Sequence, residues 1–150
     1  MTTPLNIRVT RVDGSSEIPL PAYATVGSAG MDLRAAVEDS LVLRPGQTAL
    51  VPTGLRIELP AGYEAQVRPR SGLAIERAVG ILNSPGTIDS DYRGEIKVIL
   101  TNFGGEDFTI RRGDRVAQLV IAQYVRVTWE EVAEIDGTQR GAGGFGHTGK

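Results

Sequence analysis

The chain of 150 residues has the size of a single domain with a substantial core, and its 41% hydrophobic and 23% charged residues are ordinary for a globular protein. The net charge of −2 excludes a global basic field of the kind that attracts duplex nucleic acids, so we expect no nucleic-acid partner. The lack of cysteine excludes disulfides and thiolate metal sites, and no apolar run reaches the ~18 residues of a membrane span, so we expect a cytoplasmic protein with no membrane partner.

Short segments of alternating apolar and polar residues, separated by proline and glycine turns, run through most of the chain. Near the N-terminus, Leu5, Ile7 and Val9 alternate with polar neighbours and predict a half-buried strand. Residues 71–77 form the only predicted helix, with Ser71 as its N-cap. This pattern favours an all-β barrel or sandwich of the jelly-roll type. Further short segments of the body are predicted at 29–36, 41–43, 48–51, 55–59, 63–68, 81–82, 95–102, 108–111 and 116–124, and Val125, Val127 and Trp129 are predicted to close it, with Trp129 in the core.

The last residues differ from this body. Of the 19 glycines, six fall within residues 137–149. Such a segment cannot bury a core of its own and is expected to be flexible. Phe145, a single large aromatic among the glycines, and Arg140 near the start of the segment favour an arm that folds over a ligand. We therefore expect a β domain at residues 1–135 and an arm at residues 136–150 that closes over a site.

The stretch from residue 80 to residue 98 holds the candidate chemistry. A hairpin loop that only turns the chain needs two to five residues, and this one is longer. It carries two carboxylates, an amide, a phenol and a guanidinium between segments that resemble strands. Asp89 and Asp91 bracket Ser90, and we do not expect them to act as a paired acid/base dyad. One of them can do chemistry while the other caps the turn.

Five segments of the chain match one family, in order and without large gaps: residues 29–36, 69–74, 80–98, 112–118 and 140–149. With these segments the sequence resembles the trimeric dUTP nucleotidohydrolases (dUTPases). The resemblance implies a distorted jelly-roll, β-clip-like barrel that forms a homotrimer. It also implies Mg²⁺-dependent hydrolysis of dUTP to dUMP and pyrophosphate by in-line attack of water at the α-phosphorus, which limits uracil incorporation into DNA and supplies dUMP for thymidylate synthesis.

The same resemblance implies a role for individual residues. Asp89 would orient and deprotonate the attacking water, and Asp32 would contact Mg²⁺ through bound water. Mg²⁺ suits a chain with one histidine and no cysteine, because it needs few protein ligands and is usually held by substrate phosphates and water. The implied phosphate-binding residues are Arg70, Ser71, Gly72, Gln118 and Arg140, and the implied nucleoside-binding residues are Asn83, Gly86, Thr87, Ile88, Tyr92, Lys97, Phe145 and Gly146.

Each active site would draw on three subunits of the trimer: the Asp89 hairpin from one, the Ser71 segment from a second and the arm from a third. Two alternatives remain. A dCTP deaminase-type relative would need a further carboxylate, for which the chain has no candidate outside the five segments. A catalytically silent β-trimer that serves as a binding module would not need the intact set of Asp89, Ser71, Gln118 and Arg140.

Overall fold

The computed structural model describes residues 4–149, and within them the chain is almost entirely β. The prediction of an all-β domain with one short helix is confirmed. The elements are β1 (Arg8–Arg11), β2 (Gly30–Arg34), β3 (Leu41–Leu43), β4 (Thr48–Pro52), β5 (Leu55–Glu58), β6 (Tyr63–Arg68), α1 (Ser71–Arg77), β7 (Val79–Ile81), β8 (Gly86–Ile88), β9 (Lys97–Asn102), β10 (Phe108–Ile110) and β11 (Arg115–Gln123).

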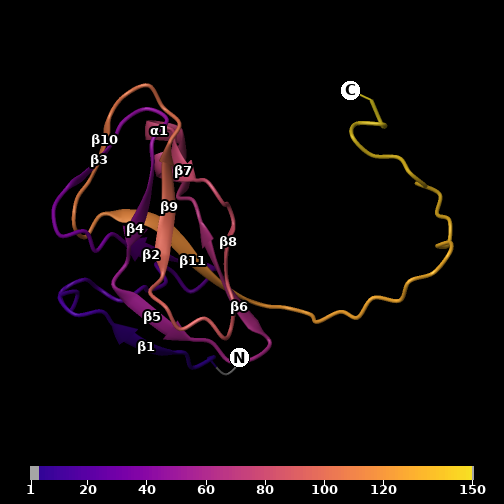
Figure 1. Cartoon of the computed structure of the whole chain (residues 1–150), viewed down its shortest axis with the longest axis horizontal. Coiled ribbons are helices and arrows are strands. Elements are labelled where there is room, and N and C mark those ends of the chain that lie inside the picture. The colour runs from indigo at the N-terminus through magenta and orange to yellow at the C-terminus, as the bar shows by residue number, and fades with distance from the viewer. Residues whose placement is uncertain (1–3, 150) are drawn as a thin grey trace.

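The strands form four small antiparallel sheets that stack around one core (Figure 1). The largest has the order β2-β11-β6-β8, and a second has the order β4-β9-β7. The remaining two are the pairs β1-β5 and β3-β10. Across residues 4–149 the sheets stay open and no barrel closes, so the architecture is a distorted jelly roll.

Strand β11 organises the largest sheet, because both of its edges are paired. On one edge Gln118 pairs with Asp32 of β2, and on the other it pairs with Arg68 of β6. Strand β6 in turn pairs with β8, where Ala65 lies opposite Ile88. Three segments that are far apart in sequence thus meet across one sheet.

The core follows from the alternation read in the sequence. In β5 and β6, for example, every second side chain is buried, and these side chains form one cluster with those of β9. Full burial of a Val, Leu or Ile side chain contributes about 1.5–3 kcal/mol, so this cluster supplies the main driving force for folding. Fully buried members include Leu33, Val51, Ala65, Val98 and Ile110.

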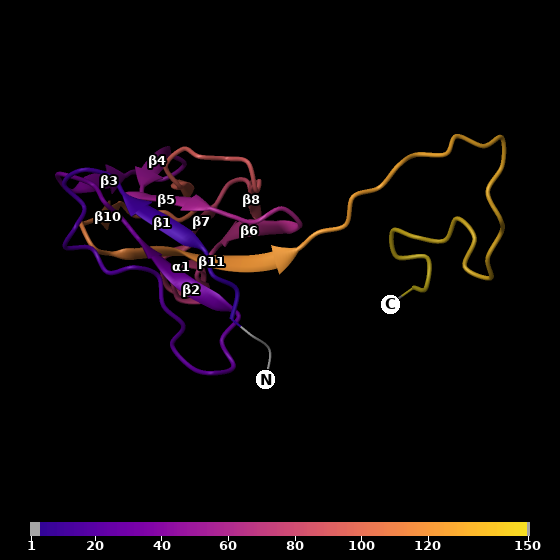
Figure 2. The ribbon, with the colours of Figure 1, turned by 90° about the horizontal axis from the view of Figure 1, so that it is seen from below.

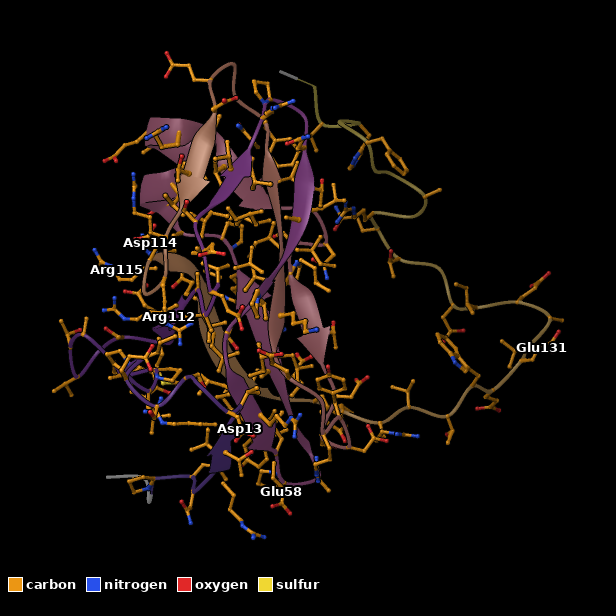
Figure 3. All side chains as sticks on the ribbon, turned by 60° about the vertical axis from the view of Figure 1, so that its left-hand side comes forward. Asp13, Glu58, Arg112, Asp114, Arg115 and Glu131 are labelled. Atoms are coloured by element: carbon orange, nitrogen blue, oxygen red, sulfur yellow. The ribbon has the colours of Figure 1, made fainter. Side chains whose placement is uncertain are left out.

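A single arginine ties three loops together near one edge of the body. Arg112 lies in the turn before β11 and donates to the carbonyl oxygens of Gly14, Ala36 (3.3 Å) and Val37 (3.0 Å). It also forms an ion pair with Glu17. Figure 3 shows Arg112 beside Asp114 and Arg115, at the edge where β11 begins. Arg112 therefore holds the N-terminal loop against the connection between β2 and β3.

Two local predictions differ from the structure. The first strand begins at Arg8 rather than Leu5, and Leu5 and Val9 are 40% and 39% exposed. Ser71 is not the N-cap of α1 but its first residue: Arg70 occupies the cap position with extended backbone and makes no side-chain cap hydrogen bond. The Arg70 side chain is used elsewhere, in an ion pair with Asp32.

The segment after β11 also differs from its prediction. Val125, Val127 and Trp129 do not close the body, because no strand follows Gln123 within the described residues and Trp129 is 93% exposed. From β11 the chain runs away from the sheets as an extended segment (Figure 2). No helix among residues 4–149 is both long and apolar enough to cross a membrane.

Replacement of Arg112 by alanine is expected to lower the midpoint of thermal unfolding. Three carbonyl oxygens and the Glu17 carboxylate would lose their donor, and the loss of about 2 kcal/mol corresponds to about 4–8 °C for a chain of this size. The measurement is thermal unfolding at fixed protein concentration. The matched control is Arg111→Ala, because within residues 4–149 the Arg111 side chain forms no hydrogen bond. Equal midpoints for the two variants would contradict this role.

The ion pair with Arg112 gives stability a dependence on pH. The hydrogen bond from Arg112 lowers the pKa of the Glu17 carboxyl below its ordinary value. A lowered pKa in the folded state means that the pair stabilises the fold at neutral pH and that this contribution is lost as pH falls through the lowered pKa. The midpoint difference between the unaltered protein and Glu17→Gln should therefore be present at neutral pH and shrink in acid.

Candidate functional site

The turn that carries Asp89 follows β8 directly and is closed by its own hydrogen bonds. The Tyr92 amide donates to the Asp89 carbonyl oxygen at 3.2 Å, and the Arg93 guanidinium donates to the Ser90 carbonyl oxygen at 2.6 Å. Asp89 is exposed at the end of a buried strand. The turn thus presents a carboxylate to solvent from a short and locally fixed backbone.

The position of the Tyr92 ring depends on a glycine at residue 94. A Cβ atom on Gly94 would lie 2.3 Å from the Tyr92 hydroxyl oxygen, so the phenol ring can lie over the backbone only because residue 94 has no side chain. The hydroxyl donates to the Glu95 carbonyl oxygen at 2.8 Å. The Glu95 carboxylate in turn accepts from the Gly54 amide at 2.9 Å. The ring is fixed at its tip although 45% of Tyr92 is exposed.

Five of the predicted site residues line one hollow of about 580 Å³, which we name the hairpin hollow. Asp89, predicted as catalytic, lies there with four residues predicted to bind the nucleoside: Thr87, Ile88, Tyr92 and Lys97. The other lining residues are Leu50, Arg56, Glu95, Ile96 and Ile99.

The predicted nucleoside residues Asn83 and Gly86 lie at the start of β8, where they contact each other. The Asn83 amide nitrogen is 3.2 Å from the position that a Cβ on Gly86 would take. Gly86 is buried, and it also lies against Val67 of the neighbouring strand. A side chain at residue 86 would push the Asn83 amide away from the strand.

Two of the predicted phosphate-binding residues line a second, separate hollow of about 460 Å³, which we name the helix hollow. Ser71 lies there at the start of α1, and Gln118 reaches it from β11. The Gln118 amide donates to the Pro69 carbonyl oxygen at 2.9 Å, which fixes its direction. The two hollows share no lining residue.

Asp32, the predicted metal contact, lies between two arginines. Its Oδ1 is 3.1 Å from Arg70 Nε and its Oδ2 is 3.4 Å from Arg115 Nη1. Arg70 also donates to the Arg115 carbonyl oxygen at 3.3 Å. Arg115 was missed in the sequence, although it lies in the segment 112–118 that supplied Gln118. The sequence shows a cation three residues before Gln118, but its contact with Asp32 depends on the pairing of β11 with β2, which the sequence does not reveal.

The residues at Asp32 fit a metal ion only in part. Among the described residues, no group of three or more His, Cys, Asp or Glu side chains could hold a metal ion. Both oxygens of the single carboxylate already accept from arginine. The donor set therefore suits a cation whose remaining ligands come from bound phosphate and water, as is usual for Mg²⁺.

The predicted residues of the arm lie away from both hollows. Arg140 donates to the Gly143 carbonyl oxygen at 2.8 Å, within its own segment. Phe145 is fully exposed and has a positive φ of 52°, a conformation that non-glycine residues rarely adopt. Gly146 follows it with φ 86°. In this single chain the arm extends outward (Figures 1 and 2), and its residues do not reach the rest of the candidate site.

Comparison with known proteins identifies the family. A family model described as dUTPase matches residues 16–149. The deoxyuridine 5'-triphosphate nucleotidohydrolase of Anaplasma marginale (strain St. Maries) is 59% identical over 145 residues, which cover 97% of this chain and 99% of the relative.

Two solved structures are similar in fold. The dUTPase of Staphylococcus bacteriophage 80alpha, in a mutant solved with dUpNHpp, has a TM-score of 0.87 at 23% identity and covers 97% of this chain and 99% of its own. A mutant dUTPase of phage phi11 of S. aureus, described with the coordination of a structural Mg(II) ion, has a TM-score of 0.79 at 22% identity over 89% of this chain and all of its own. At these identities the two structures support the fold alone. The family model and the relative from Anaplasma marginale, taken together, show that the chain belongs to the dUTPase family.

Proposed function

We propose that this protein hydrolyses dUTP to dUMP and pyrophosphate, and so limits uracil incorporation into DNA and supplies dUMP for thymidylate synthesis. The observation that carries the proposal is the hairpin hollow, in which the Asp89 carboxylate lies among Thr87, Ile88, Tyr92 and Lys97. Family membership and the name of the relative that is 59% identical support the same substrate.

Asp89 acts as the general base in this proposal. Its carboxylate orients a water molecule and accepts a proton from it as the water oxygen attacks the α-phosphorus. The bond from the α-phosphorus to the oxygen that bridges to the β-phosphate breaks in line, and pyrophosphate leaves. Ser71 and Gly72, with free amides at the start of α1, hold the phosphates together with Arg70, Gln118 and Arg140. Positioning and charge neutralisation supply most of the rate.

The nucleoside is selected by shape and by backbone polarity. The fixed Tyr92 ring lies beneath the deoxyribose, where a ribose 2′-hydroxyl would clash with it. Asn83 and the backbone of Gly86, Thr87 and Ile88 read the edge of uracil, with Lys97 at the same hollow. Phe145 of the arm stacks on the base, an interaction worth about 1–3 kcal/mol in other nucleic-acid sites, and Gly146 allows the turn that follows it.

Mg²⁺ is the proposed cofactor. When bound, it neutralises charge on the triphosphate and so makes the phosphorus easier to attack. The triphosphate and water would supply most of its ligands, and Asp32 would contact it through water. In this chain Asp32 also orients Arg70, since the two side chains form an ion pair at 3.1 Å.

The homotrimer is proposed from the separation of the site and from exposed apolar surface. The hairpin hollow and the helix hollow share no lining residue, which supports a site divided between chains. The outer face of the β4-β9-β7 sheet and its flanks expose Leu50 (57%), Leu82 (61%) and Phe103 (61%). Exposed apolar groups of this extent mark an interaction surface. We therefore assign the hairpin to one subunit, the Ser71 segment to a second and the arm to a third.

A second apolar surface fits the segment after β11. Val125, Val127 and Trp129 alternate with polar residues and are exposed; we name them the apolar strip. A groove of about 440 Å³ lies beside β1 and is lined mainly by apolar residues, among them Leu5, Ile7 and Val9. Within the described residues β1 pairs only with β5, so its other edge is free to accept a strand. The strip of one subunit would fill the groove of its neighbour.

This packing also accounts for the expected domain boundary. Residues 124–135 would become part of the folded body in the trimer, and residues 136–150 would remain as the arm. The glycines of the arm permit the turns that closure over the site requires, including the positive φ angles at Gly141 and Gly146.

The reaction is tested by pyrophosphate release from dUTP, dTTP, dCTP and UTP, with and without Mg²⁺. Fast release is expected from dUTP alone and with Mg²⁺ present. Asp89→Asn should bind dUTP but lose at least about 100-fold in kcat, the lower end of the contribution of a general base. Asp91→Asn is the matched control, because Asp91 does not line the hairpin hollow. No release from any nucleotide would favour a silent trimer, and ammonia from dCTP would favour a deaminase.

Gly94→Ala is expected to weaken discrimination against UTP. The new Cβ would displace the Tyr92 ring, so the ratio of kcat/KM for dUTP over UTP should fall by about an order of magnitude. The control is Gly105→Ala, where a Cβ meets open space. An unchanged ratio would show that Tyr92 does not select the sugar.

Val127→Asp is expected to break the trimer, because it places a charge in the apolar groove. Light scattering after size exclusion should give about three times the 16.0 kDa chain for the unaltered protein and a smaller mass for the variant. Thr128→Asp, on the opposite side of the same segment, should leave the mass unchanged. A trimeric Val127→Asp variant would show that the strip does not pack between subunits.

A further inference from the structure

A third hollow borders the turn that carries Asp89 and includes none of the predicted nucleoside-binding residues. It measures about 480 Å³ and is lined by Glu64, Asp89, Ser90, Asp91, Tyr124 and Arg126; we name it the rear hollow. Asp89 is the only residue that lines both the rear hollow and the hairpin hollow. A group that lies in the rear hollow can thus act on Asp89 without entering the space proposed for the nucleoside.

Tyr124 is such a group, and its backbone is well fixed. It is the first residue after β11, and its amide donates to the Gly62 carbonyl oxygen at 3.0 Å. Strand β6 separates β11 from β8, since Ala65 pairs with Ile121 on one side and with Ile88 on the other. To contact the turn after β8, a side chain from the end of β11 must cross β6. The long phenol of Tyr124 does so.

The contact that it makes is with Ser90, the neighbour of Asp89. The two hydroxyl oxygens are 3.4 Å apart, and the hydrogen bond from Ser90 lowers the pKa of the Tyr124 phenol. The other side-chain hydrogen bond to this part of the turn comes from Arg93, which belongs to the turn itself. Within the described chain, Tyr124 is the residue outside the turn whose side chain hydrogen-bonds to residues 89–91.

We propose that Tyr124 is a positioning residue for Asp89, and that it acts through the Ser90 hydroxyl from the point where the segment after β11 leaves the sheet. This inference rests on the proposed function, in which Asp89 is the general base. Tyr124 restrains the turn from behind, and the general base must stay within hydrogen-bond reach of its water for the reaction to proceed. The phenol touches no part of the hairpin hollow, so it influences the reaction rather than nucleoside binding.

The test compares the turnover of dUTP by Tyr124→Phe, Ser90→Ala and the double variant. Each single variant is expected to lower kcat about three- to ten-fold, the range for loss of one neutral hydrogen bond, with KM changed less than about two-fold. The double variant should lose no more than either single variant, because both remove the same bond. Ser90→Thr keeps a hydroxyl and should retain most of the kcat. Additive losses, or an equal effect on KM, would overturn the proposal.

Tyr63→Phe is the matched control. Tyr63 lies on β6, and its hydroxyl accepts a hydrogen bond from Gln123 at 3.0 Å, so the variant also loses a tyrosine hydroxyl bond beside the end of β11 but not one to the turn. Its kcat should stay within about two-fold of the value for the unaltered protein, because the lost hydrogen bond is at the surface and does not reach the turn that carries Asp89.

Deuterium exchange separates this inference from the proposed function, because it needs no substrate. Backbone amides of residues 86–95 should exchange faster in Tyr124→Phe than in the unaltered protein or in Tyr63→Phe, whereas those of β11 should not change. If the unaltered protein does not turn over dUTP, the proposed function fails, and exchange alone decides whether Tyr124 restrains the turn. If dUTP is turned over but both kcat and exchange are unchanged in Tyr124→Phe, the inference on Tyr124 is wrong.

Discussion

Antiparallel pairing along both edges of β11 is the constraint on which the rest of the structure depends. This strand has nine residues and joins β2 on one side to β6 and, through it, β8 on the other. The register fixes what each residue of β11 can reach: Gln118 lies between Asp32 and Arg68, and Ile121 lies opposite Ala65. Because side chains alternate between the two faces of a sheet, a shift of one residue would exchange the buried Leu119 with Gln118. The residues predicted to bind phosphate and the residue predicted to act as the base thus depend on the same set of backbone hydrogen bonds.

Exposed apolar surface in the single chain and the division of the candidate site have one explanation. A chain that left Trp129, Phe103 and Leu82 in water would give up hydrophobic stabilisation that a neighbouring copy could supply. Asp89, the proposed base, lines the hairpin hollow, which shares no lining residue with the helix hollow. If subunits associate through the apolar surfaces, they also bring these parts together, so folding, assembly and completion of the site are linked in the proposed trimer.

Some features were predictable from the sequence because they depend on neighbouring residues. The alternation in β5, β6 and β9 reports burial on one face, and the structure agrees. The five predicted site residues that line the hairpin hollow all lie within residues 87–97, and the resemblance to the dUTPase family supplied their roles. The first strand was misplaced because alternation reports burial and not hydrogen bonding: Leu5 is apolar, but pairing with β5 begins at Arg8. Trp129 was assigned to the core because a large apolar side chain indicates burial. The residue type does not indicate whether the same chain or a neighbouring subunit would bury it.

Arg115 and Tyr124 were not predictable from the sequence, because their contacts cross strands. Arg115 reaches Asp32 only because β11 pairs with β2, and Tyr124 reaches Ser90 only because β6 and β8 lie side by side. Similarly, Ser71 was chosen as a cap by residue type, but Arg70 takes the cap position and its side chain pairs with Asp32. Such contacts need the register of the sheet, which one sequence does not reveal.

The charges around Asp32 bear on how a triphosphate would enter. In the free chain one carboxylate is shared by Arg70 and Arg115, so the local charge is a single excess positive charge. A triphosphate carries several negative charges, and the arginines cannot neutralise it while they also pair with Asp32. Mg²⁺ held by the phosphates would supply the missing positive charge, and the Asp32 carboxylate would then face that cation through water instead of opposing an anion. The metal requirement proposed for this protein therefore follows from the number of charges at the site as well as from the chemistry at phosphorus.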